Sequence, residues 1–257
     1  MCLILFAWKV RADTPLIVAA NRDEWHRRAA AAATWWSSHR NILAGQDLEA
    51  RGTWLGVTRA GKFAAITNFR EPSQVKTGAP SRGHLAVDYL SGQQSPREYL
   101  EELASHASEY NGFNLLLADR ENMFCYSSAE NKIEEVAPGI HGLSNRALDT
   151  PWPKVEIGRA ALGAAIEAKM PEGALPERLL AILANDVRAP DAALPDTGVG
   201  LDWERKLSSA LIVSEDYGTR CSTIFIGGVN STKFSEHTRD ASGVIVSTAA
   251  FEFSSIS

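Results

Sequence analysis

The sequence predicts an α+β protein whose sheets are mostly antiparallel and covered by helices. Short apolar runs of strand length follow one another through turns of a few residues, and such turns join antiparallel neighbours. Two regions of helical periodicity interrupt the strands, one after residue 95 and one from residue 155 to 183. Blocks of strands therefore alternate with blocks of helices, as expected when helices cover the sheets.

Four apolar runs near the N-terminus predict two antiparallel hairpins, with strands at residues 2–10, 15–20, 54–58 and 63–67. Gly61 supplies the positive φ that the second hairpin needs at its turn. Polar residues follow each hairpin, namely Asn21-Arg22-Asp23-Glu24 and Asn68. Residues 69–80 are rich in breakers and predict a surface loop.

The rest of the chain predicts helices and two further groups of strands. Ser95-Pro96-Arg97-Glu98 has the cap, the proline and the capping glutamate of a helix start. Two later helices, divided by Pro171 and Gly173, should pack as a hairpin, and Pro190 to Gly200 should form a flexible excursion. Strands are expected at residues 113–118, 123–127, 132–136, 219–226, 233–237 and 244–253.

Composition excludes several classes of function. We expect one domain over residues 1–257. A net charge of −5 without basic blocks argues against a nucleic-acid partner. Three cysteines without CxxC spacing and six scattered histidines predict no metal site and a reducing compartment. No apolar run approaches about 18 residues, so we expect a cytoplasmic protein with no integral membrane segment.

Cys2 is the candidate nucleophile. If Met1 is removed, which a small second residue permits, Cys2 carries both a thiol and a free α-amine. An α-amine with a pKa of about 7.7–8.0 can accept the thiol proton near neutral pH, so no histidine is needed. A cationic neighbour should make Cys2 more reactive than Cys125 and Cys221. The alternative is that Cys2 is a small core residue.

Polar residues at the ends of apolar runs are the other candidates for the site: Asn21, Asp23, Asn68, Asn145 and Arg220. Asparagine amides at such positions can donate to an oxyanion, although the same positions also favour turn-forming asparagine.

Four residues are candidates for ligand binding: Asn21, Arg22, Trp54 and His84. His84 follows Ser81-Arg82-Gly83 at an expected helix start, where backbone N–H groups bind anions. Trp54 can cover an apolar ligand body.

Eight short motifs together resemble the NRDE-motif family, also called the transport-and-Golgi-organisation family. They are Met1-Cys2, Ala20-Asn21-Arg22-Asp23-Glu24, Gly52-Thr53-Trp54-Leu55-Gly56, Thr67-Asn68, Asn111-Gly112-Phe113-Asn114-Leu115, Gly142-Leu143-Ser144-Asn145, Pro151-Trp152 and Tyr217-Gly218-Thr219-Arg220. The resemblance implies the four-layer αββα sandwich of N-terminal nucleophile hydrolases.

A more distant resemblance, to bile-salt hydrolases and penicillin V acylases, implies roles for single residues. Cys2 would be the nucleophile, Asp23 would hold its α-amine, and Asn68 and Asn145 would position the amine or form the oxyanion hole. Arg220 would lower the thiol pKa or bind an anionic group. Those hydrolases place an arginine where this chain has Ala20, and Arg22 is the candidate substitute.

Two functions follow from these features. The first is hydrolysis of an amide or thioester of a small, partly apolar, anionic substrate by Cys2, with no cofactor required. The second, implied by the family resemblance, is non-catalytic binding and trafficking of haem or acyl-coenzyme A on the same fold. The expected partner is therefore a small molecule: an acyl thioester, an amide or haem. Retention of Met1, and alanine at position 20, favour the second function.

Overall fold

The computed structural model describes residues 2–168, 171, 173–229 and 231–254. The chain divides into two compact units. Unit 1 consists of the residues up to Arg27 together with Pro138–Glu252, and unit 2 consists of Arg28–Ala137 with the C-terminal residues from Phe253. The prediction of a single domain over the whole chain stays a prediction, and each unit is described by itself.

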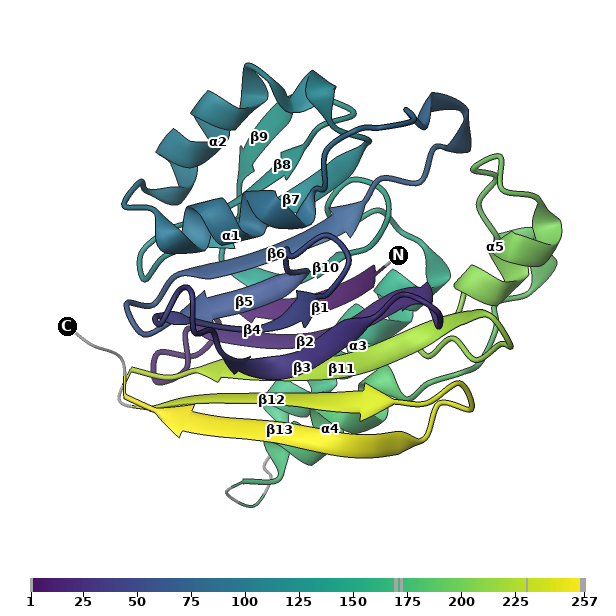
Figure 1. Ribbon diagram of the computed structural model, residues 1–257. Helices are drawn as coiled ribbons and strands as arrows, with labels where there is room; N and C mark the ends of the chain where they lie inside the picture. The colour runs from purple at the N-terminus through teal and green to yellow at the C-terminus, as the bar shows by residue number, and fades with distance from the viewer. Residues whose placement is uncertain (1, 169–170, 172, 230, 255–257) are drawn as a thin grey trace. The chain divides into compact units, whose positions relative to one another are not determined.

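Unit 1 is built on a six-stranded sheet, called sheet A, with the strand order β10-β1-β2-β11-β12-β13 (Figure 1). Its strands are β1 (Cys2–Trp8), β2 (Leu16–Trp25), β10 (Gly139–Leu143), β11 (Tyr217–Gly227), β12 (Thr232–Arg239) and β13 (Ile245–Phe253). The pairs β1–β10, β1–β2, β2–β11 and β11–β12 are all antiparallel. The predicted N-terminal hairpin is confirmed.

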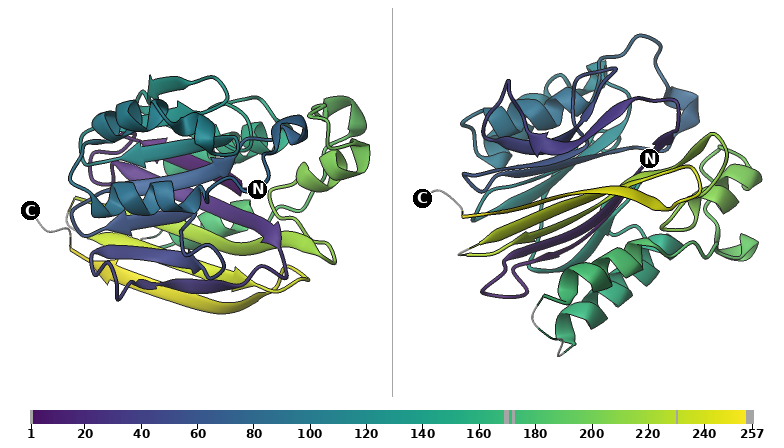
Figure 2. Two further views of the ribbon diagram at one scale, coloured as in Figure 1. Left: turned by 45° about the horizontal axis from the view of Figure 1, so that its top comes forward. Right: turned by 60° about the horizontal axis from the view of Figure 1, so that its bottom comes forward.

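Helices α3 (Pro153–Glu167) and α4 (Leu175–Leu183) cover one face of sheet A. The short α5 (Leu201–Leu207) instead packs Trp203 against Tyr217 at the start of β11. Helices α3 and α4 contact each other; α3 packs on β1 and β10, and α4 packs on β2 and β11 (Figure 2). Leu3, Leu5 and Ile17 join Leu162 and Leu179 in the core between this face and the two helices. The predicted pairing of the two helices is confirmed.

Unit 2 is built on a seven-stranded sheet, called sheet B, whose strands follow one another in sequence order. They are β3 (Ala30–Trp35), β4 (Ile42–Asp47), β5 (Leu55–Thr58), β6 (Phe63–Asn68), β7 (Phe113–Ala118), β8 (Met123–Ser127) and β9 (Lys132–Glu135). Helix α1 (Gly83–Ser91) packs on β4, β5 and β6, and α2 (Pro96–Ala104) packs on β8 and β9. The capping box predicted at Ser95 and Glu98 is present, and Gly61 has the expected positive φ of 90°.

Three expectations need correction. Strand β2 does not end at Ala20 but continues to Trp25, because β1 and β11 pair with it on both sides. Strands β3, β4 and β10 were not predicted. The segment from Pro190 to Gly200 contains a short 3-10 helix, Asp191–Ala193, and leads directly into α5.

Among the described residues, no helix combines the length and the apolar character needed to cross a membrane. The α+β class with antiparallel, helix-covered sheets is confirmed.

Candidate active site

Cys2 is the first residue of β1 and lies on the face of sheet A that is turned away from α3 and α4. The neighbouring Leu3 and Leu5 belong to the core beneath those helices. Because side chains alternate along a strand, Cys2 points to the opposite face. Cys2 is partly exposed, whereas Cys125 and Cys221 are buried as expected.

Arg22 lies between two thiols in a row across three strands. It pairs with Cys2 of β1 on one side and with Cys221 of β11 on the other. Arg22 is only 5% exposed, although arginine normally lies at the surface. Because paired residues of adjacent strands share a face, the row brings one buried cation and two thiols together.

The pKa of Cys2 does not follow the expected direction. Burial raises the pKa of this thiol, the carboxylate of Asp23 raises it further, and the charge of Arg22 lowers it. The net pKa of Cys2 is above its usual value, so the predicted lowering is wrong for this state of the chain. Burial, with the carboxylate of Glu236, raises the pKa of Cys221 well above its usual value.

Asp23 contacts the nucleophile through its backbone. A hydrogen bond from the Asp23 amide lowers the pKa of the Cys2 thiol, which places that amide at the sulfur. The carboxylate is 1% exposed and accepts a hydrogen bond of 2.7 Å from Thr219 Oγ1. Thr219 Oγ1 in turn accepts from the amide of Ile212 at 2.9 Å. The carboxylate of Asp23 is thus held by β11, and its charge raises the pKa of the Cys2 thiol.

Ser144 and Asn145 follow β10 on the other side of Cys2. Strand β10 pairs with β1 through Leu143 opposite Ile4, so the next residues of β10 run toward the start of β1. Ser144 Oγ donates to the carbonyl of Cys2 at 3.0 Å and lies 3.3 Å from Asn145 Oδ1. Asn145 is fully buried. The structure therefore brings Asn145 close to Cys2 through Ser144, and its role in an oxyanion hole stays a prediction.

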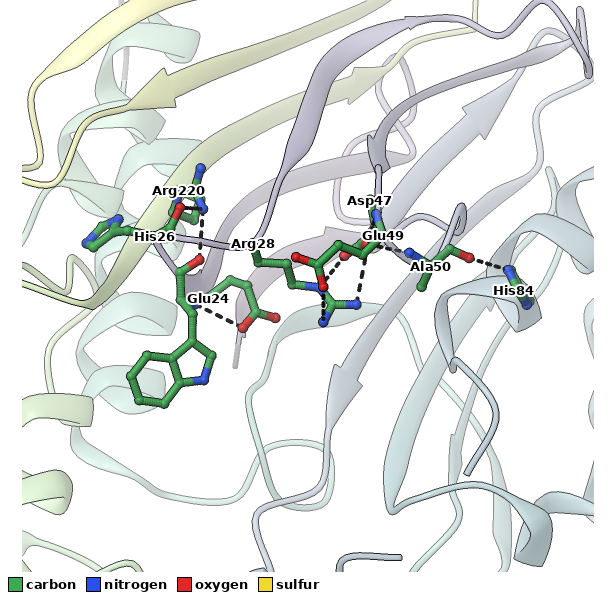
Figure 3. Close-up of polar contacts among 9 residues, drawn as sticks. Glu24, His26, Arg28, Asp47, Glu49, Ala50, His84 and Arg220 are labelled. Atoms are coloured by element: carbon green, nitrogen blue, oxygen red, sulfur yellow. Dashed lines mark hydrogen bonds and ion pairs between the residues drawn. The ribbon is translucent and has the colours of Figure 1, made fainter. Parts of the chain in front are cut away.

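Arg220 is the extra residue of a β-bulge in β11, between Thr219 and Cys221. Its Nη1 donates to the carbonyls of Trp25 at 2.9 Å and His26 at 3.0 Å, shown in Figure 3. Burial and the charge of Arg22 lower the pKa of Arg220. The arginine that shifts the pKa of Cys2 is Arg22, which sequence reasoning had ranked behind Arg220.

Asn21 lies on the opposite face from Cys2, since residues of β2 alternate between the two faces. Its amide nitrogen donates to the carbonyls of Leu183 at 2.9 Å and Ala210 at 2.8 Å. Its Oδ1 accepts from Ser222 Oγ at 2.7 Å, and Arg239 Nε donates to the same hydroxyl at 2.9 Å. These contacts tie β2 to the helix layer, away from the thiol.

Three predicted residues belong to unit 2. Asn68 is the last residue of β6 and is partly buried. Trp54 precedes β5 and is also partly buried. His84 is exposed in the first turn of α1, with Nε2 2.5 Å from the carbonyl of Ala50 (Figure 3). Their roles in a site stay predictions.

Sequence reasoning missed Ser144, Thr219, Cys221 and Glu236 as parts of this environment. Ser144 and Thr219 lie inside two of the motifs noted above, which was the available signal. Nothing in the sequence alone pairs Cys221 with Arg22. Among the residues that the structure describes, no group of three His, Cys, Asp or Glu side chains could hold a metal ion.

Two solved structures share the fold of this chain. An N-acylethanolamine-hydrolyzing acid amidase ortholog from Caenorhabditis elegans aligns with a TM-score of 0.50 and 8% identity, covering 88% of this chain and 92% of that one. A cysteine-to-alanine mutant of the conjugated bile acid hydrolase from Clostridium perfringens aligns with a TM-score of 0.55 and 11% identity, covering 98% and 92%. At such identities the likeness shows the fold alone, which is the N-terminal nucleophile hydrolase fold.

Sequence relatives identify the family. A Transport and Golgi organization protein 2 homolog from Bos taurus is 36% identical over 248 residues, covering 88% of each chain. The homolog from Homo sapiens is 33% identical over 264 residues, covering 94% of this chain and 95% of that one. Residues 1–241 match the family pattern of Transport and Golgi organisation 2. The chain therefore belongs to the Transport and Golgi organisation 2 family.

Proposed function

We propose that the protein is a cysteine N-terminal nucleophile hydrolase that cleaves an amide or thioester of a small, partly apolar, anionic substrate. The observation that carries this proposal is the position of the Cys2 thiol at the backbone amide of Asp23 and beside the buried Arg22. The two structural neighbours, by their own descriptions, hydrolyse N-acylethanolamines and conjugated bile acids. One is described as an amidase and the other as a hydrolase, which supports the reaction class.

The proposed reaction begins once Met1 has been removed and Cys2 has a free α-amine. The amine takes the thiol proton, and the sulfur attacks the substrate carbonyl carbon. Collapse of the tetrahedral intermediate breaks the C–N or C–S bond, and the leaving group takes the proton from the ammonium. Water, deprotonated by the same amine, then attacks the acyl-cysteine, which releases the carboxylic acid and restores the thiol.

The raised pKa of Cys2 fits this sequence of steps. A neutral thiol at rest forms a thiolate only when the neighbouring base takes its proton, so attack is coupled to deprotonation. Arg22 offers a fixed positive charge to the thiolate as it forms. Asp23 is placed to hold the protonated amine, and the amide of Asn145 is the candidate donor to the oxyanion.

Intact mass spectrometry tests the proposal. Protein lacking Met1 is incubated with decanoyl-pantetheine as a thioester and with a decanoyl amide of an amino acid. We expect a decanoyl adduct on Cys2 and release of decanoate, with neither in the Cys2→Ser variant. The Cys125→Ser variant is the matched control and should behave as the unmutated protein. Turnover that persists in Cys2→Ser, or none in the Met1-free protein, would contradict the proposal.

One observation favours the second function. Ala20, at the position where the related hydrolases have an arginine, is buried between Ile4 and Thr223, so this position of β2 carries no charge. Binding and trafficking of haem or acyl-coenzyme A needs neither a second arginine nor a free α-amine. Under this alternative, protein that retains Met1 binds haem or decanoyl-coenzyme A with the same affinity before and after Cys2→Ser. An affinity that depends on Cys2 and on Met1 removal argues for the hydrolase.

A further inference from the structure

A groove runs between helices α3 and α4 in unit 1, with a volume of about 350 Å³. Its two walls are regular helix faces: Lys154, Ile157, Gly158 and Ala161 on α3, and Arg178, Ala181, Ile182 and Asn185 from α4 onward. Both sets have the spacing i, i+3, i+4, i+7 of a single helix face. Seven residues of helix span about 10 Å, which sets the length of the groove.

Small residues keep the groove open. Ala161 on α3 and Ala181 on α4 lie where larger side chains would fill the space between the helices. Gly158 lets α3 pack closely on β1, because an added Cβ would lie 2.6 Å from Leu5 Cδ1. The groove also has exposed apolar walls, since Ile157 is 53% exposed and Val187 is 71% exposed. This apolar surface faces solvent where a ligand could cover it.

The groove carries positive charge. Its described lining includes Lys154, Arg178 and Arg188 and no carboxylate. The two arginines are exposed, so their guanidinium groups can reach a ligand. By contrast, the neutral polar groups of the lining are used within the protein. Asn185 Oδ1 accepts from the amide of Val187 at 3.0 Å, and Ser208 Oγ accepts from the amide of Ala189 at 3.0 Å.

We propose that this groove binds an anionic amphiphile, an unbranched alkyl chain with a carboxylate head group. The apolar floor and walls match the alkyl chain, and the arginines match the head group in charge. A volume of about 350 Å³ suits a small molecule, since ligand pockets start near about 300 Å³. The groove lies in the helix layer, whereas Cys2 points from the other face of sheet A, so this site is separate from the catalytic one.

Isothermal titration calorimetry with octanoate, decanoate and dodecanoate, each below its critical micelle concentration, tests the proposal. Affinity should rise by about tenfold from octanoate to decanoate, because each buried methylene adds a near-constant increment. It should level off at dodecanoate, whose chain is longer than a groove of about 10 Å. Decanol should bind at least tenfold more weakly than decanoate. Decyl phosphate reports on the source of the head group: binding tighter than decanoate points to a phospholipid-like ligand, and weaker binding points to a free fatty acid.

Variants locate the binding. Ala181→Phe, at an exposed position, should fill the groove and abolish binding, while Arg178→Gln and Arg188→Gln should each weaken it by about tenfold. Arg40→Gln, which removes an exposed arginine from unit 2, is the matched control and should change nothing. Cys2→Ser should also leave decanoate affinity unchanged.

Hydrogen exchange gives a readout that does not depend on the variants. Decanoate should protect amides of α3 and α4 in the unmutated protein while leaving those of sheet B unchanged. The proposal is overturned if decanoate does not bind saturably, if Ala181→Phe binds as tightly as the unmutated protein, or if Cys2→Ser abolishes binding. The last result would assign the ligand to the thiol site.

Discussion

Arg22 is the arginine whose charge acts on the thiol. It lies opposite Cys2 in the sheet and lowers the pKa of a thiol that burial raises. We predict that Arg22→Gln raises the pKa of Cys2 further and slows its reaction with iodoacetamide at neutral pH by roughly threefold to tenfold. Peptide mapping of labelled protein measures the rate at each cysteine.

Cys125 and Cys221 serve as internal references in this measurement, because both are buried. Cys2 should react faster than either in the unmutated protein. Equal labelling of all three cysteines, or an unchanged rate at Cys2 after Arg22→Gln, would show that the arginine does not control the thiol.

Asp23 should matter for function more than for folding. Its carboxylate accepts from Thr219 Oγ1 and its amide contacts the thiol, so Asp23→Asn keeps the shape but removes the charge. We predict a loss of at least about a hundredfold in acyl transfer, since the ammonium form of the amine loses its counter-charge. Single-turnover kinetics measure this loss. Thr219→Ser, which keeps the hydroxyl, should retain activity.

At the scale of elements, Asn21 fastens β2 to the helix layer. Its amide donates to the carbonyls of Leu183 and Ala210, and its oxygen accepts from Ser222. We predict that Asn21→Ala destabilises the fold by about 2–4 kcal/mol, because it leaves buried polar groups without partners. Urea unfolding measures the change. Cys2 labelling in the remaining folded protein should be normal; a lost thiol reactivity with unchanged stability would mean that Asn21 acts in the site.

The loop after β10 depends on pH through Asp149. Burial raises the pKa of this carboxyl, but hydrogen bonds from His141 Nδ1 and the amide of Gly142, with the charges of His141 and Arg159, lower it by more. A lowered pKa stabilises the fold above the unfolded value of about 3.9, and that stability is lost as pH falls through the folded value.

We therefore predict that Asp149→Asn lowers the free energy of unfolding by about 1 kcal/mol at pH 6.5 and by less at pH 2.5. Urea unfolding at the two pH values measures the difference. Asp202→Asn is the control, since that side chain is 95% exposed. An equal loss at both pH values would show that the carboxylate acts by shape rather than by charge.

Sequence patterns predicted the elements whose apolar residues follow the period of their structure. Met123–Ser127 was predicted with its observed bounds, and Ser95 was predicted as the cap of α2. Strand β3 was missed because its alanine-rich sequence, Ala30–Trp35, has little β-propensity. The extension of β2 through Asn21 and Arg22 was missed because buried charged residues are rare within strands.

The candidate site was predicted only in part, because local sequence patterns mark single residues but not their neighbours on other strands. Cys2, Asp23 and Asn145 could be named from the sequence because each lies in one of the motifs, and the structure places Asp23 and Asn145 near Cys2. The choice between Arg22 and Arg220 depends on strand register and on the bulge at Arg220, which are long-range properties. No local pattern encodes which residue of β11 stands opposite Arg22.

At the scale of the whole molecule, unit 2 is an insertion in the sequence of unit 1. Sheet A pairs Ile4 with Leu143 and Asn21 with Ser222, whereas sheet B pairs strands in sequence order. Contacts between distant residues form late, because closing long loops costs entropy. We predict that amides of β5–β8 become protected before those of β1 and β2 during refolding.

Pulsed hydrogen exchange with mass spectrometry measures this order. Peptides from residues 55–68 and 113–127 report on sheet B, and peptides from residues 2–25 report on sheet A. Simultaneous protection of both sets, or earlier protection of the N-terminal peptides, would contradict the prediction.

The same insertion has a consequence for synthesis on the ribosome. Strands β1 and β2 emerge first, yet β11, which pairs with Arg22 and holds Asp23, is made only when most of the chain has left the tunnel. Until then sheet A lacks β11, β12 and β13, and the apolar strand Cys2–Trp8 is exposed to binding by chaperones. The amino end is also accessible to aminopeptidases during this interval. Under the proposed function, removal of Met1 from the nascent chain would come before the surroundings of Cys2 are complete, and the nascent chain would not react with acyl donors as the finished protein would.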